Sequence, residues 1–177
     1  PTALEPAKTK KGVNMNTKKD PLDEVIEKIN ETFENPFLGS DVIAGFAGET
    51  EEDFEITRKN LLSSGLTQIH TFPYSKRKGT IGAEMENQVP DDVKNSRATI
   101  IKEISKEKLS NFIEKNLGKT LEVLIEKHPD KHSQNLKGMT RNYLTIQIPS
   151  DRTDLFNTLQ MVKLVKFENG KIYGELV

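Results

Sequence analysis

The apolar positions between residues 20 and 46 follow two different patterns. In "DPLDEVIEKINETF" they recur every three or four residues, which predicts an amphipathic helix that ends near residue 35. Asp20 is placed as its N-cap and Pro21 as its first helical residue. The stretch "FLGSDVIAGF", residues 37–46, is mostly apolar and is typical of a strand buried on both faces. The apolar stripe of the helix consists of Leu22, Val25, Ile26, Ile29 and Phe33.

A second helix and a second strand follow at a similar interval. Thr50 can cap a helix whose first turn, residues 51–53, is acidic and therefore favourable beside the positive end of the helix dipole. Gly65 is well placed to end this helix, and "LTQIHTFPYS", residues 66–75, predicts another strand. Helix, strand, helix, strand in this order predicts a parallel α/β arrangement. The inner face of the second helix consists of Phe54, Thr57, Leu61 and Leu62.

The pattern changes again after residue 89. A longer helix is expected from Pro90 to about Asn116, with Gly118 as its stop. Beyond it the apolar period becomes two, in "TLEVLIE", in "NYLTIQIP" and in a hairpin centred on Asn169-Gly170. These short strands predict a separate small antiparallel β-barrel. The expected fold class is a partial α/β unit, a long helix and this small barrel.

Composition narrows the class of protein. The chain has 177 residues, of which 34% are hydrophobic and 30% charged. Its apolar runs are far shorter than the roughly 20 residues that span a bilayer, and residues 1–19 lack the apolar block of a secretory signal. We therefore expect a cytoplasmic protein without a membrane partner. Residues 1–19 carry five lysines and one acid, and they are expected to form a disordered basic leader.

Charge is distributed unevenly along the chain. Residues 20–55 carry twelve acids and one lysine, whereas residues 56–177 carry 20 basic and 14 acidic residues. A basic C-terminal part suits an anionic partner such as RNA. A solvated charged surface with no partner explains the same counts.

Several kinds of chemistry are excluded or disfavoured. The chain contains no cysteine, which excludes disulfides, thiolate metal sites and iron-sulfur ligation by its own residues. His70, His128 and His132 are scattered, and Pro129 argues against one helical face for the last two, so no metal site is predicted. No arrangement of a nucleophile with a base is evident, and no catalytic residue is predicted.

The segment "DVIAGFAGETEEDF", residues 41–54, places glycines directly after the first strand. The carboxyl end of a parallel strand is where α/β sheets bind ligands, and Gly45 and Gly48 would let a flat ligand approach the backbone. The acids that follow disfavour a phosphate and favour a neutral or cationic ligand. A plain strand-to-helix turn with glycines for tight geometry is the alternative reading.

Several motifs, in fixed order, together resemble one family. "DVIAGFAGETEEDF" resembles the GFPGET-type segment near the end of the radical S-adenosylmethionine barrel in tRNA methylthiotransferases, and "TFPYSKRKGTIGAEM" resembles their FxYSxRxGT loop. "VPDDVKNSRATIIKEIS" is similar to the connecting helix of that family, including Arg97. "GKTLEVLIE" resembles the first strand of the RNA-binding TRAM barrel. "GMTRNYLTIQIP" and "GKIYGELV" resemble the branch that acts on threonylcarbamoyladenosine.

The resemblance covers about residues 22 to 177 and implies a domain organisation. Residues 20–88 would be the C-terminal portion of the radical S-adenosylmethionine (β/α) barrel, and residues 89–117 the connecting helix. Residues 118–177 would be the TRAM domain, an OB-like barrel that binds RNA. The implied partner is the anticodon arm of tRNA, and the implied cofactors of the full-length family are S-adenosylmethionine and an iron-sulfur cluster.

The resemblance also implies site residues near the first two strands. Ile43 and Gly45 would lie against the adenine and ribose of S-adenosylmethionine. Glu49 would orient the loop or the cofactor, or it is simply an acid beside a helix N-terminus. The RNA-facing loop would be an anion site, with a solvated turn as the alternative; its residues are Tyr74, Lys76 and Arg77.

A second set of RNA-binding residues is implied in the barrel. It combines phosphate donors with a ring on which a base can stack. Tyr143 could instead be an aromatic residue of a cross-strand pair. The set consists of Lys119, Arg141, Asn142 and Tyr143.

This sequence departs from the family pattern at informative positions. The family usually has proline where this chain has Ala47 and Lys76, and neither change removes a reactive group. The CxxxCxxC loop that holds the cluster is absent, because the chain has no cysteine. We therefore expect a C-terminal fragment, either a truncated gene product or one subunit of a split enzyme that a separate cluster-bearing chain completes. The alternative function is a stand-alone RNA-binding module.

Overall fold

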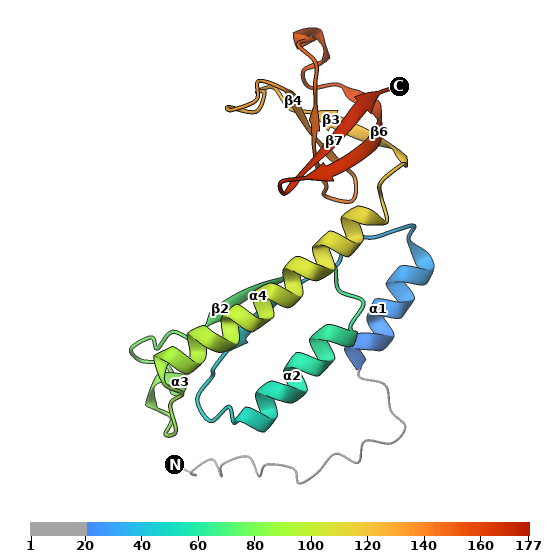
Figure 1. Ribbon diagram of the computed structural model, residues 1–177. Coiled ribbons are helices and arrows are strands. Elements are labelled where there is room, and N and C mark those ends of the chain that lie inside the picture. The colour runs from blue at the N-terminus through green and yellow to red at the C-terminus, as the bar shows by residue number, and fades with distance from the viewer. Residues whose placement is uncertain (1–20) are drawn as a thin grey trace.

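One long helix, α4 (Asp91–Glu114), runs through the computed structural model and joins two groups of secondary structure (Figure 1). The structure describes residues 21–177. The expected basic leader, residues 1–19, and the expected N-cap Asp20 lie outside the described residues. The predicted helix from Pro90 to about Asn116 is confirmed to within two residues at either end.

The first group is built on two strands. β1 (Gly39–Ala44) and β2 (Gln68–Pro73) pair in parallel, and α2 (Glu51–Ser63) connects them. α1 (Pro21–Thr32) precedes them in the chain. The order of helix, strand, helix and strand that the sequence predicts is confirmed.

α2 begins where its sequence is suited to begin. The hydroxyl of Thr50 accepts a hydrogen bond from the backbone N–H of Asp53, and the Asp53 carboxylate accepts one from the backbone N–H of Thr50. This reciprocal capping box satisfies two donors that a helix start otherwise leaves unpaired. The predicted cap is confirmed, and it fixes where the loop after β1 ends and the helix starts.

The helices cover one face of the two-stranded sheet (Figure 1). Ile69 of β2 is buried there against Phe54 of α2 and Ile101 of α4. The same cluster also contains the buried side chain of Ile26 from α1. The first core of the protein is therefore a layer between the sheet and its helices.

The opposite face of the sheet is open, which corrects the expectation of a strand buried on both faces. Ile43 of β1 and its partner Phe72 of β2 are 57% and 54% exposed. Asp41 and His70, which pair two residues earlier along the strands, are exposed as well. The mostly apolar composition of β1 was a correct sign of a strand, but no described element covers this face.

The stripe expected on α1 is also only partly buried. Ile26 packs into the core, whereas Leu22, Val25 and Phe33 are exposed. Leu62, expected on the inner face of α2, is exposed as well. The periodicity located both helices correctly, but it did not tell how much of each apolar face would find a neighbour.

The second group is a closed barrel of five strands in the order β3-β4-β5-β7-β6. The expected antiparallel barrel is corrected in one respect, because β5 and β7 pair in parallel and the barrel is therefore mixed. A single 3-10 turn, η1 (Thr153–Leu155), lies between β5 and β6. The strands are β3 (Thr120–Ile125), β4 (Leu136–Thr140), β5 (Thr145–Ile148), β6 (Leu159–Glu168) and β7 (Lys171–Leu176).

The barrel core follows the period of two that the sequence shows. Val123 and Ile125 of β3 are fully buried, and Ile146 of β5 is buried opposite them. A Cβ at Gly174 of β7 would overlap the side chain of Val162, so the small residue allows the narrow barrel to close. The predicted hairpin at Asn169-Gly170 is confirmed as the connection of β6 and β7.

α4 contributes side chains to both cores. Ile101 belongs to the core under the sheet, whereas Phe112 and Ile113, near the other end, belong to the core of the barrel. A short helix, α3 (Ile81–Glu84), lies in the connection from β2 to α4. Within residues 21–177, no helix combines the length and the apolarity needed to cross a membrane.

Candidate functional site

The loop after β1 takes its shape from two glycines with positive φ. Gly45 has φ 75° and Gly48 has φ 84°, a region that other residues seldom adopt. Gly45 is buried, and a Cβ at this position would overlap Cγ of Lys94 in α4. Gly48 faces open space. The bare backbone at Gly45 therefore lets α4 pass close to the tip of β1.

A network of charged groups holds this loop in place. The backbone N–H of Gly45 donates to both carboxylate oxygens of Glu49 at 3.1 Å. Arg97 of α4 donates to the same carboxylate at 2.6 Å, to the backbone carbonyl of Glu49 at 3.1 Å and to the Glu51 carboxylate at 2.9 Å. The Glu49 carboxylate thus connects its own loop to α4. Of the roles named for Glu49, this contact supports that of orienting the loop.

Arg97 is almost completely buried, with 6% of its side chain exposed. Burial lowers the pKa of the Arg97 guanidinium, but its hydrogen bonds to Glu51 and Glu49 outweigh this effect and raise that pKa above its usual value. The guanidinium also lies 5.1 Å from the centre of the Phe54 ring. It is therefore a permanently charged clamp between the loop and α4.

Sequence reasoning did not place Lys94 and Arg97 at the site. The available signal was their position, because both lie in phase with the buried stripe of α4 that continues through Ala98, Ile101 and Ile104. A charged residue on the buried face of a helix requires a partner in the interior. For Arg97 this partner is Glu49, which lies 48 residues earlier in the chain, so the pattern within the helix could not identify it.

The open face of the sheet forms one side of a cavity of about 740 Å³. Ile43, Phe46 and Phe72 line it with apolar surface, and Tyr74 adds a ring that packs edge-on against Phe46 with centroids 4.8 Å apart. Apolar and aromatic walls with a few polar groups are typical of sites for small molecules with flat rings. Ile43, for which the resemblance implies contact with adenine, lines this cavity, whereas Gly45 and the Glu49 carboxylate are occupied by contacts within the protein.

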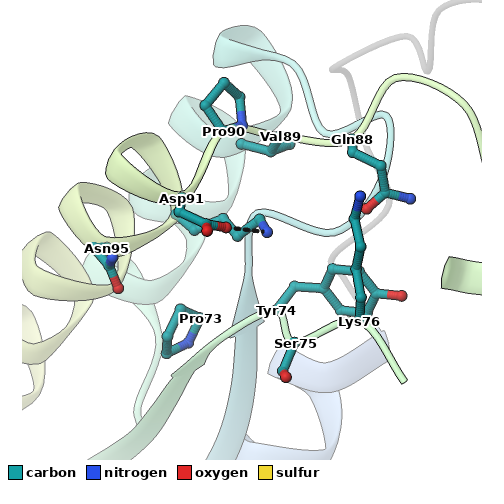
Figure 2. Close-up of a pocket in the computed structure, with 10 residues that line it drawn as sticks. Pro73, Tyr74, Ser75, Lys76, Gln88, Val89, Pro90, Asp91 and Asn95 are labelled. Atoms are coloured by element: carbon teal, nitrogen blue, oxygen red, sulfur yellow. Dashed lines mark hydrogen bonds and ion pairs between the residues drawn. The ribbon is translucent and has the colours of Figure 1, made fainter. Parts of the chain in front are cut away.

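The loop after β2 brings its predicted residues together. Tyr74 and Arg77 line the cavity beside the open sheet face, and Tyr74 and Lys76 line a second cavity against the start of α4 (Figure 2). Lys76 and Arg77 are exposed. The loop therefore presents two cations and one ring next to two cavities.

The barrel brings Lys119, Arg141 and Asn142 to one hollow of about 300 Å³ beside the end of α4. Arg141 is 85% exposed at its side chain and pairs with Glu122 at 2.7 Å. Tyr143, the next residue, is 68% exposed and has φ 61°. Two cations at the hollow, with an exposed ring at the next position in the chain, have the chemistry that an RNA backbone and an unstacked base require.

Polar contacts join this hollow to the first group. The fully buried side chain of Asn116 accepts hydrogen bonds from Asn35 and from Asn142, and it donates to the carbonyl of Phe112 at 2.7 Å. Phe37 packs 6.0 Å from the Tyr143 ring. The predicted RNA-binding residues thus form two separate clusters, one near the start of α4 and one beyond its end.

The three histidines lie at two separate places in the fold. His70 lies on the open sheet face, and His128 and His132 lie in the connection between β3 and β4. In the part of the chain that the structure describes, no group of three or more histidine, aspartate or glutamate residues is arranged to hold a metal ion.

Comparison with known proteins gives the family context. The chain is 35% identical over 161 residues to a tRNA-2-methylthio-N(6)-dimethylallyladenosine synthase of Caldicellulosiruptor saccharolyticus, a match that covers 91% of the chain. It is 38% identical over 140 residues to a threonylcarbamoyladenosine tRNA methylthiotransferase of Rickettsia prowazekii, which covers 79% of the chain. The chain is a relative of the tRNA methylthiotransferases. No family model matches it.

These tRNA methylthiotransferases are much longer than the matched region. The chain spans about a third of their length, 34% and 31% for the two relatives named. A third relative, the tRNA-2-methylthio-N(6)-dimethylallyladenosine synthase of Aquifex aeolicus, is 36% identical and shows the same proportion, 34%. Some of the matching relatives are named for dimethylallyladenosine and others for threonylcarbamoyladenosine, so the comparisons support the resemblance to tRNA methylthiotransferases and do not resolve the branch.

Proposed function

We propose that this chain is the tRNA-binding portion of a radical S-adenosylmethionine tRNA methylthiotransferase, corresponding to the end of its (β/α) barrel, the connecting helix and the TRAM domain. The observation that carries the proposal is the match to tRNA methylthiotransferases over about nine-tenths of the chain. The exposed cations and rings at both ends of α4 support it. The anticodon arm of tRNA is the proposed ligand.

The cofactors of the family fit this chain unequally. The apolar wall of Ile43, Phe46 and Phe72 suits the adenine of S-adenosylmethionine, a cofactor that supplies radical chemistry when a cluster cleaves it. The iron-sulfur cluster does not fit, because the chain contains no cysteine to ligate it. We therefore propose that the chain is not catalytic by itself and assign it no step of the reaction.

The finer assignment to the threonylcarbamoyladenosine branch rests on "GMTRNYLTIQIP" and "GKIYGELV" in the barrel. The first segment contains Arg141 and Asn142, which line the hollow beside α4, and Tyr143, which follows them in the chain. A comparison of anticodon arms that carry threonylcarbamoyladenosine, dimethylallyladenosine or unmodified adenosine tests the branch. Tighter binding of the first arm is expected, and preference for the second would overturn the assignment.

Binding to tRNA is tested by gel shifts of an anticodon-arm hairpin at two salt concentrations. Phosphate contacts release counterions, so each contact contributes roughly 0.7 to 0.9 to the slope of log affinity against log salt. Arg141→Ala should reduce the magnitude of that slope by about the contribution of one phosphate contact. Arg152→Ala is the matched control, because Arg152 is also an exposed barrel arginine paired with one acid, Asp154 at 2.7 Å, but does not line the hollow. Equal effects of the two variants would contradict the proposed surface.

A second candidate is a subunit of a split enzyme. The open apolar face of the sheet favours it, because Ile43 and Phe72 are more than half exposed in the chain alone. Mixing with a separate chain that carries CxxxCxxC should protect this face from hydrogen-deuterium exchange and give methylthiolated tRNA. Tight tRNA binding with no change on mixing would instead support a stand-alone RNA-binding module.

A further inference from the structure

A cavity of about 640 Å³ lies between the loop after β2 and the first turn of α4 (Figure 2). It shares Pro73, Tyr74 and Ser75 with the apolar cavity on the open sheet face, but its other walls come from the start of α4 and from the segment before it. The charged residues that line it are Lys76, Lys94 and Asp91, and Ser75 and Asn95 add polar side chains.

Lys94 reaches this cavity from the interior. The residue is only 4% exposed, and its stem passes the bare backbone of Gly45. Its ammonium lies 5.8 Å from the centre of the Tyr74 ring and donates to the Asp91 carboxylate at 2.8 Å. Burying a lysine is unfavourable unless its charge finds a partner, and Asp91 is the anion that the structure pairs with this ammonium at the cavity wall.

The partner of Lys94 lies at the protein surface. The Asp91 side chain is 91% exposed, so water and other solutes reach its carboxylate, although the Lys94 side chain is only 6% exposed. The hydrogen bond and charge of Lys94, with a smaller contribution from the charge of Lys76, lower the pKa of the Asp91 carboxyl. Both ammonium groups therefore act on one small region, and an exposed carboxylate occupies it.

We propose that this cavity binds a backbone phosphate of RNA between Lys94 and Lys76, and that Asp91 is an internal anion which the phosphate displaces. The proposal rests on the proposed function, because it names where the tRNA backbone is held near the start of α4. Two ammonium groups with the Ser75 hydroxyl and the Asn95 amide offer donors to several phosphate oxygens. Asp91 then weakens binding, since the phosphate has to compete with it.

This competition gives an experiment in which removal of a side chain improves binding. Asp91→Asn should tighten binding of an anticodon-arm RNA by about fivefold, because the phosphate no longer competes with a carboxylate for Lys94. Asp92→Asn is the matched control, because Asp92 is the neighbouring exposed acid, brings the same change in charge and does not line the cavity. It should change affinity less than about twofold. Lys76→Ala should weaken binding. All three side chains are exposed, so the variants are expected to fold.

Titration with inorganic phosphate, followed by NMR shifts of the backbone amides of Ser75 and Asn95, tests the cavity without RNA. Shifts that grow in Asp91→Asn and shrink in Lys76→Ala, together with the RNA result, support the proposal. Equal effects of Asp91→Asn and Asp92→Asn on RNA would overturn it. If Asp91→Asn binds inorganic phosphate more tightly but binds RNA no more tightly, the assignment of the cavity to RNA is overturned.

The test separates this inference from the proposed function. If Arg141→Ala weakens RNA binding while the cavity variants leave it unchanged, the barrel binds tRNA and the cavity proposal is wrong. If the parent protein does not bind the arm at all, the proposed function is wrong. The cavity proposal then fails as well, because no RNA is bound that could place a backbone phosphate in the cavity.

Discussion

At the scale of single residues, Gly45 shows how one position can serve packing and geometry together. Its φ of 75° favours glycine, and a Cβ there would overlap the Lys94 stem. Gly48 has a similar φ of 84° but open space around it. The two glycines of one loop are therefore required for different reasons.

This difference predicts unequal effects of the same substitution. Gly48→Ala should lower the free energy of unfolding by about 1 kcal/mol, because only backbone strain is added. Gly45→Ala should lower it by about 2 kcal/mol or more, because α4 also has to move. Urea unfolding of both variants measures the two values. Equal losses would show that Lys94 does not constrain Gly45.

Arg97 is the second residue whose role is specific. Arg97→Met keeps the length of the side chain but leaves the Glu49 carboxylate without its 2.6 Å partner. The expected loss is about 3 kcal/mol of unfolding free energy, as for a buried pair that loses one member.

Arg58→Met is the control for this change. Arg58 forms an equally short pair with Glu55 at 2.7 Å, but on the surface of α2, where a much smaller loss is expected. Both variants can be compared by urea unfolding. A similar loss in the two would contradict the view that Arg97 is a buried clamp.

At the scale of elements, local patterns predicted most of the structure. The capping box at Thr50, the parallel order of β1 and β2 and the hairpin at Asn169-Gly170 depend on neighbouring residues, and all were predictable. The parallel pairing of β5 with β7 was not, because it joins strands separated by more than 20 residues and depends on how the barrel closes. The exposure of Ile43 was missed because burial depends on what else packs on the sheet.

The candidate site divides in the same way. Residues of the loop after β2 were predicted as a group because they are consecutive in the chain, and Lys119 joins Arg141 and Asn142 through the strand pairing of the barrel. Lys94 was missed because its role depends on the crossing of α4 over Gly45, which no local pattern encodes.

Asp130 gives the connection between β3 and β4 a dependence on pH. The backbone N–H of Ser133, then its hydroxyl, and further donors from Gln147 and His132 hold the pKa of the Asp130 carboxyl well below its usual range. A carboxyl with a lowered folded-state pKa stabilises the fold above its unfolded pKa of 3.8 and loses that effect as the pH falls toward the folded value.

Thermal unfolding between about pH 5 and pH 2.5 checks this sign. The melting temperature of the parent should fall with pH through this range, and Asp130→Asn should melt lower at neutral pH but show a flatter dependence. Asp151→Asn, an exposed aspartate of the same barrel, should keep the slope of the parent. An unchanged slope in Asp130→Asn would contradict the assignment.

At the scale of the whole molecule, Asn116 connects the two groups. Its buried amide receives hydrogen bonds from Asn35 before β1 and from Asn142 in the barrel. Loss of this acceptor leaves two polar partners unsatisfied near the junction, a penalty of about 1 to 3 kcal/mol. The orientation of the barrel should therefore depend on one side chain.

Asn116→Ala tests this dependence. Calorimetry should show the single transition of the parent broaden or divide, because the two cores unfold less cooperatively once the junction is weakened. Asn111→Ala, an exposed asparagine on the same helix, should leave the transition unchanged. A sharp transition that only shifts in temperature would indicate a local loss of stability without uncoupling.

Because α4 belongs to both cores, it sets the phase and spacing of the two groups. A helix of 24 residues is about 36 Å long, and each added residue turns its far end by about 100°. One residue inserted near its middle would rotate the Arg141 surface about the helix axis, away from the side on which the Lys76 loop lies. Seven inserted residues would nearly restore the original angle but would increase the distance between the two surfaces by about 10 Å. Any rigid ligand that touches both surfaces has to match that pitch.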